Sequence, residues 1–164
     1  MQAILWQHRY RCHITVLLAA ALLAGGLVHL YPAAQAQTGH WRRFEAEQGP
    51  GRYEVWTIAP AADGSVWLGT SKGLWQYHNG NWTHFMPGPD TGLSHENVLA
   101  ILHDRFGVWW FGTWGGGIAR FDGERWLPPL TAANSRLPSD YIRALLQDSR
   151  GDIWIGTPKG LARL

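Results

Sequence analysis

The sequence is short of cysteine and of charge, and both shortages restrict what the protein can do. Its single cysteine, Cys12, lies in the leader, so residues 37–164 have none, which is compatible with an oxidising compartment without requiring one. Charged residues make up only 16% of the chain. When Arg9 and Arg11 of the leader are left out, the chain has 12 basic and 12 acidic residues, so its formal charges balance. A chain with balanced charges lacks the excess of Lys and Arg that binds the phosphates of nucleic acid, so we expect no nucleic-acid partner.

The sequence also lacks a catalytic or metal-binding constellation. Ser94-His95-Glu96 contains catalytic residue types, but adjacency in a loop is not the geometry of a triad. The Trp114-Gly-Gly-Gly117 run lacks the Gly-Lys-Ser/Thr ending of a phosphate loop and is better explained as a hairpin turn. Four histidines show no metal-ligand spacing, namely His78, His84, His95 and His103. We therefore expect no enzymatic activity, no cofactor and no metal.

Residues 1–36 are predicted to be an export signal. Arg9 and Arg11 flank the apolar segment 14–30, and Ala-Gln-Ala at 34–36 supplies the small residues of a cleavage site. The apolar segment has 17 residues, the short end of what spans a bilayer, so an uncleaved N-terminal anchor is the alternative. Both interpretations place the rest of the chain in the periplasm or otherwise outside the cytoplasm, anchored to the inner membrane if the leader is retained.

What the sequence does contain is a repeat of just over forty residues. The stretch Asp104-Arg-Phe-Gly-Val-Trp-Trp-Phe-Gly-Thr113 recurs in recognisable form at 61–70 and 148–157. The aligned tryptophans are separated by 43 and 44 residues: Trp67, Trp110 and Trp154. Each copy leads from a Gly-containing turn into an apolar, aromatic run and ends at Gly-Thr, which indicates a strand entered through a tight turn. A constant period of this length indicates one supersecondary unit repeated.

The repeat extends on both sides of this stretch, and it predicts four strands per copy. Apolar runs precede it at 55–58, 98–101 and 142–145, and glycine-led runs follow it at 73–77, 117–121 and 160–164. Asn79-Gly80 and Asp122-Gly123 then form hairpin turns before runs that open on Trp82 and Trp126. Four short antiparallel strands per repeat are typical of a β-propeller blade. The predicted fold is therefore all-β, an incomplete propeller with about two full blades and parts of others, preceded by an apolar leader helix.

These motifs resemble the two-component regulator propeller repeat. The pattern is Asp-x-x-Gly-x-x-Trp-x-Gly-Thr, then Gly-Leu, then Asp-Gly-x-x-Trp, with a blade lead-in at Leu137–Ile142 and a looser one at Leu93–Val98. The resemblance covers roughly residues 41–164, and it departs from the pattern at Ala61, where the other copies have Asp. It implies an extracytoplasmic sensor domain that precedes a membrane-spanning segment and a cytoplasmic output, often a histidine kinase or a diguanylate cyclase. It also implies plant or host polysaccharide fragments as ligands.

Residues 37–164 are expected to form the partial propeller, with repeats at about 53–85, 96–127 and 140–164 and an extra outer strand at 40–44. Three blades fall below the usual ~4–8, so we expect the chain to be the amino-terminal piece of a longer signal-transduction protein. The alternative is that several copies assemble into one ring through their open blade edges. Apart from the leader, only a downstream segment absent from this sequence would contact the membrane.

Strand directions divide the loops between two faces, and the face with the long inter-blade connections is where we expect a ligand. An oligosaccharide or another small extracellular molecule is the expected partner. The candidate contacts on that face are Lys72, His95, Glu96, Trp114, Asp140 and Tyr141. Trp114 breaks the repeat pattern, whereas Trp67, Trp110 and Trp154 recur at one position and are expected to pack between sheets. A propeller lyase or hydrolase and a non-catalytic protein-interaction scaffold are the alternatives.

Overall fold

The computed structural model describes residues 42–44 and 49–164. The predicted leader lies outside these residues, as do residues 40 and 41 of the predicted extra strand, and residues 42–44 are not part of a strand. None of the described residues forms a helix with the length and apolar character needed to cross a lipid bilayer.

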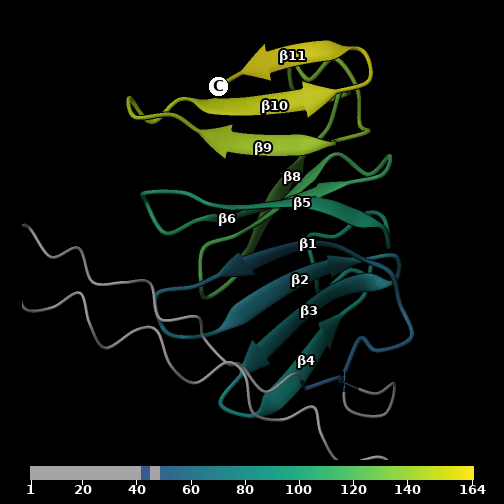
Figure 1. Ribbon diagram of the computed structural model, residues 1–164. Helices are drawn as coiled ribbons and strands as arrows, with labels where there is room; N and C mark the ends of the chain where they lie inside the picture. The colour runs from purple at the N-terminus through teal and green to yellow at the C-terminus, as the bar shows by residue number, and fades with distance from the viewer. Residues whose placement is uncertain (1–41, 45–48) are drawn as a thin grey trace, which may run out of the picture. The chain divides into compact units, whose positions relative to one another are not determined.

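In the described part of the chain, eleven strands form three antiparallel sheets, which confirms the predicted all-β fold (Figure 1). The first sheet contains β1 Val55–Pro60, β2 Val66–Thr70, β3 Gly73–His78 and β4 Asn81–Phe85, paired in that order. The second contains β5 Val98–His103, β6 Trp109–Thr113, β7 Ile118–Phe121 and β8 Trp126–Leu130. The third has only three strands, β9 Ala144–Gln147, β10 Ile153–Thr157 and β11 Gly160–Arg163. These are the blades that the repeat predicts.

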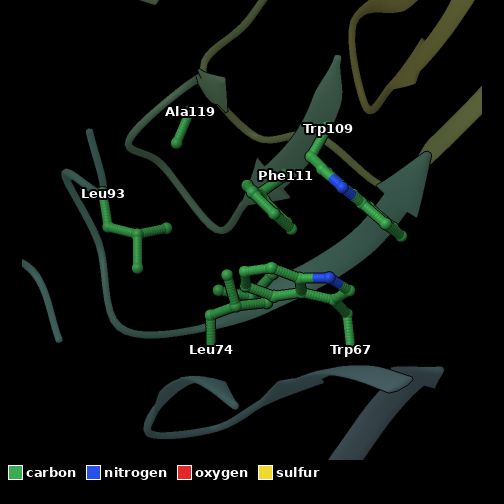
Figure 2. Close-up of a cluster of buried hydrophobic side chains, with 7 residues drawn as sticks. Trp67, Leu74, Leu93, Trp109, Phe111 and Ala119 are labelled. Carbon is green, nitrogen blue, oxygen red and sulfur yellow. The ribbon is translucent and has the colours of Figure 1, made fainter. Parts of the chain in front are cut away.

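Two hydrophobic clusters lie between consecutive sheets. In the first, the Trp67 ring of β2 lies 5.4 Å from the Trp109 ring and 5.3 Å from the Phe111 ring of β6, measured between centroids (Figure 2). In the second, Trp110 of β6 packs with Ile153 and Ile155 of β10. Trp67 and Trp110 therefore fill the space between sheets, as the repeat predicts, and each sheet relies on its neighbour to bury its apolar face.

The Gly-Thr pair that ends the second strand of the first and second sheets serves this packing in two ways. A Cβ atom on Gly69 would lie 2.5 Å from the Val98 backbone oxygen, and one on Gly112 would lie 2.6 Å from the Ile142 side chain. No side chain fits there, so glycine is what allows the next inner strand to approach. The following threonine is fully buried and closes the hairpin, because Oγ1 of Thr113 donates to the Gly117 oxygen and accepts from the Gly116 N–H.

A carboxylate holds both the turn and the tryptophan of the second and third repeats. Oδ1 of Asp104 accepts hydrogen bonds from the Phe106 and Val108 N–H groups, and Oδ2 accepts one from the Trp110 indole at 2.8 Å. Asp148 repeats the arrangement, with the Trp154 indole N–H at 3.0 Å from Oδ2. This indole bond, together with the N–H groups of the turn, lowers the pKa of Asp148 from 3.8 to about 2.

Substitution of Gly69 by alanine tests the close approach between sheets. The added Cβ would meet backbone, which cannot rotate away, so we expect Gly69→Ala to lower the free energy of unfolding by about 1–3 kcal/mol. Urea denaturation followed by tryptophan fluorescence measures the loss. The matched control is Gly88→Ala, because a Cβ at Gly88 would have no atom within 4 Å. Equal unfolding midpoints for the two variants would contradict the argument.

The lowered pKa of Asp148 predicts acid sensitivity. Because the folded-state pKa of about 2 lies below the ordinary 3.8, the stabilisation is present above pH ~4 and is lost as the pH falls towards 2. We expect the free energy of unfolding to decline less steeply over that window in Asp148→Asn than in the unmodified chain. Trp154→Phe keeps the carboxylate but removes the indole N–H. An NMR titration of this variant should show the Asp148 pKa rising towards 3.8, and an unchanged pKa would exclude the indole as its cause.

Candidate functional site

The loop face, defined here as turns 71–72, 114–116 and 158–159 with lead-ins 93–97 and 137–141, is joined across consecutive sheets by backbone hydrogen bonds. The Gly73 N–H donates to the Glu96 oxygen at 2.6 Å, and the Gly117 N–H donates to the Asp140 oxygen at 2.9 Å. The turns of the first and second sheets are thus bonded to the lead-ins of the second and third sheets. The turns 71–72 and 114–116 are therefore held by the sheets on both sides of them.

Two leucines anchor these lead-ins. Leu93 is 3% exposed and belongs to the cluster between the first and second sheets, and Leu137 is 8% exposed and belongs to the next cluster. Both occupy the first position of the lead-in motif. The motif therefore has a packing role, and the polar residues that follow each leucine are fixed relative to the sheets.

Trp114 and Tyr141 form an exposed aromatic pair on this face. Each is 44% exposed, and their ring centroids lie 5.5 Å apart at an interplanar angle of 85°. A β-bridge joins the two residues, and the Trp114 N–H donates to the Asn97 oxygen at 3.0 Å. Large aromatic side chains held rigidly and left exposed are uncommon in a packed domain, since burial would stabilise them.

Arg143 completes the group, and it stands at the position where the first two inner strands have a bulge. The register of β1 shifts at Trp56 and that of β5 shifts at Leu99, and Arg143 occupies the corresponding position in the third repeat. A bulge redirects the side chain that it carries. The Arg143 guanidinium lies 5.8 Å from the centroid of the Trp114 ring. Within the described residues, it has this ring partner and no carboxylate partner.

The other predicted contacts are engaged in interactions of their own. Nζ of Lys72 lies 2.9 Å from both carboxylate oxygens of Glu96. This exposed ion pair links the first sheet to the lead-in of the second sheet. Nδ1 of His95 accepts from the Asn97 N–H at 3.0 Å, and Oδ1 of Asp140 accepts from the Ala132 N–H at 2.6 Å. The structure therefore brings together Trp114 and Tyr141, and separately Lys72 and Glu96. Ligand contact by any of the six residues stays a prediction.

Sequence reasoning left Arg143 out of the predicted site. The available signal was that Arg143 is the only charge in the inner-strand runs 55–58, 98–101 and 142–145. Its contact with Trp114 joins two repeats and cannot be read from either one alone. The resulting group offers two aromatic surfaces beside a planar cation, which suits binding of a ring with an attached anion. Among the residues that the structure describes, no three His, Cys, Asp or Glu side chains are arranged to hold a metal ion.

Solved structures with this architecture include proteins of differing function. The chain is similar to the extracellular domain of BT3049 of B. thetaiotaomicron, described as a hybrid two component system, with 22% identity and a TM-score of 0.61 over 68% of this chain and 16% of that one. It is also similar to PorZ, a surface component of the type-IX secretion system of Porphyromonas gingivalis, with 24% identity and a TM-score of 0.51 over 65% of this chain and 17% of that one. A third is a virginiamycin B lyase of Staphylococcus aureus, with 15% identity and a TM-score of 0.51 over 74% of this chain and 43% of that one.

Identities this low establish the fold alone, and the chain spans less than half the length of each of these structures. A comparison with curated proteins found no match. The family model described as "Two component regulator propeller" matches residues 92–115 and 136–159. Each match runs from a lead-in through the inner strand and the second strand to the loop-face turn, the part of the repeat that carries the leucine, the turn aspartate, the tryptophan and the Gly-Thr pair. Two segments of the chain, residues 92–115 and 136–159, therefore carry the two component regulator propeller repeat.

Proposed function

We propose that this chain is a ligand-binding sensor propeller that acts outside the cytoplasm as part of a two-component type of signalling protein. The observation that carries the proposal is the exposed Trp114–Tyr141 pair with the guanidinium of Arg143 beside it. A binding site needs exposed groups that are already ordered before the ligand arrives, because ordering them on binding would cost affinity. The backbone bonds at Trp114 and the β-bridge to Tyr141 meet this need.

The proposed ligand is an acidic oligosaccharide. The apolar face of a sugar ring packs on an exposed aromatic ring, so Trp114 and Tyr141 would hold the sugar units. A guanidinium binds a carboxylate or sulfate through its N–H edge while its flat face remains over an aromatic ring. Arg143 would thus keep its contact with Trp114 and also hold the acidic group. Because the loop face has a cation without a carboxylate partner among the described residues, it favours an acidic ligand over a neutral one.

The likeness to an extracellular domain of a two component system supports the placement outside the cell interior and the sensing role. In this proposal the output domain belongs to a longer parent protein. The likeness to a lyase supports only the fold, and no observation on the loop face favours hydrolysis or elimination over binding.

The ligand is tested by isothermal titration calorimetry with oligogalacturonides and with the same oligosaccharides reduced to their neutral form. We expect the acidic form to bind more tightly, and Trp114→Ala to weaken its affinity by about tenfold or more, which corresponds to a loss of about 1.4 kcal/mol. Arg143→Gln should remove the preference for the acidic form while keeping residual binding of both.

Phe106→Ala is the matched control, because Phe106 is 74% exposed but lies in an Asp-x-x-Gly turn away from the loop face. It should bind as the unmodified chain does. Equal affinities for the acidic and neutral forms would leave the aromatic site in place but contradict the choice of ligand. Binding that survives Trp114→Ala unchanged would refute the site.

A further inference from the structure

The lead-ins of the second and third sheets make the same hydrogen bond with different side chains. In the lead-in 137–141, the hydroxyl oxygen of Ser139 accepts from the Tyr141 N–H at 3.2 Å. In the lead-in 93–97, Nδ1 of His95 accepts from the Asn97 N–H at 3.0 Å. Both acceptors stand two residues after the leucine of their lead-in, and both donors stand four residues after it. His95 therefore takes the place of a serine, and a side chain that titrates near neutral pH replaces one that does not.

The hydrogen bond at His95 is linked to the exposed aromatic pair through one residue. Asn97 donates its N–H to His95, and its carbonyl oxygen accepts from the Trp114 N–H at 3.0 Å. Trp114 is in turn joined to Tyr141 by the β-bridge. Asn97 is thus held by the imidazole on one side and holds the backbone of Trp114 on the other. A change at Nδ1 of His95 therefore acts on the residue that fixes Trp114.

Protonation of the imidazole would remove the acceptor. A neutral imidazole has one N–H and one bare nitrogen, and since Nδ1 of His95 accepts, its proton lies on Nε2. An imidazolium carries a hydrogen on both nitrogens, so Nδ1 would then face the Asn97 N–H with a second donor. Two donors do not bond, and the Asn97 N–H would lose its partner. The bond is therefore present while the imidazole is neutral, and it is lost as the pH falls and the ring becomes charged.

We propose that His95 is a positioning residue for Trp114 and makes ligand binding at the aromatic pair depend on pH. Binding is strong while His95 is neutral and weaker when it is charged. The inference rests on the proposed function, because it concerns the regulation of the same site. In a sensor that acts outside the cytoplasm, the same ligand concentration would then produce a weaker response in acidic surroundings.

The carboxylate next to His95 in the chain is already engaged. Both oxygens of Glu96 are held by Nζ of Lys72 at 2.9 Å. The turn 114–116, which is bonded to the lead-in through Trp114, has no titratable side chain. Other titratable or charged side chains on the neighbouring segments are Asp90, Asp140, Tyr141, Arg143 and His84, whose Nε2 lies 2.6 Å from the Lys72 carbonyl oxygen. His84 is therefore the rival source of a pH dependence near neutral pH, and the experiment must separate the two histidines.

An NMR titration of the full chain tests the coupling without a ligand. We expect the Asn97 and Trp114 amide signals to shift with the same midpoint as the His95 ring. In His95→Ser, which introduces the acceptor used in the lead-in 137–141, both amide signals should stay in place over that range. A Trp114 amide that stays in place while His95 titrates would overturn the proposal, and so would one that titrates equally in His95→Ser.

Calorimetry with oligogalacturonides at pH 7.5 and pH 5.5, where the ligand carboxylates are ionised, measures the effect on binding. We expect the affinity of the unmodified chain to be about fivefold weaker at pH 5.5, the effect of losing one ordinary hydrogen bond. His95→Ala should be weak at both values, because it has no acceptor, and His95→Ser should restore tight binding at both. His78→Gln is the matched control and should keep the pH dependence, because His78 lies at the opposite end of β3 from the turn 71–72.

The outcomes separate this inference from the proposed function. If the unmodified chain binds oligogalacturonides but His95→Ser keeps the pH dependence, the site stands and another group such as His84 is responsible, which overturns the inference. An affinity that rises as the pH falls would also overturn it, because the His95 cation would then attract the acidic ligand directly. If no oligogalacturonide binds, the choice of ligand fails, and the NMR titration still decides whether His95 holds Trp114.

Discussion

The close approach of consecutive sheets is the constraint on which the rest of this structure depends. A three- or four-stranded sheet of this size cannot bury an apolar face alone, so each one depends on the sheet beside it. The approach is possible because Gly69 and Gly112 have no side chain where Val98 and Ile142 arrive. The repeat tryptophans then fill the space further along the same strands. Glycine, tryptophan and the buried aliphatic residue thus form one packing unit, which explains why they recur together with a constant spacing.

The loop face follows from the same constraint. The lead-ins to the second and third sheets each begin with a buried leucine and end with the aliphatic residue that approaches the glycine, as in Leu137 and Ile142. With both ends fixed, the residues between them have little conformational freedom even though they form a loop. Side chains such as Tyr141 are therefore displayed on an ordered backbone, the condition under which loops on a rigid scaffold carry function.

Much of the fold was predictable because its signals are local. Asn79-Gly80 and Asp122-Gly123 specify hairpins by their own backbone preferences, and the Gly-Thr pairs mark strand ends wherever they occur. The exposure of Trp114 was predictable in the same way, as a departure from the repeat. Arg143 was not, because its aromatic partner, Trp114, belongs to the turn of the preceding sheet. The use of Asp140 and His95 as acceptors for backbone N–H groups also depends on loop conformations that no spacing encodes.

The aromatic pair has a mechanical consequence, since its two members belong to different blades. Trp114 directly follows the second strand of one sheet, and Tyr141 with Arg143 leads into the next. A molecule that contacts all three would span the seam between the two sheets and oppose any sliding of one past the other. Occupancy would then be transmitted as a stiffening of the array, with little change in the position of any atom, and a domain attached to the propeller would sense how freely its blades shift.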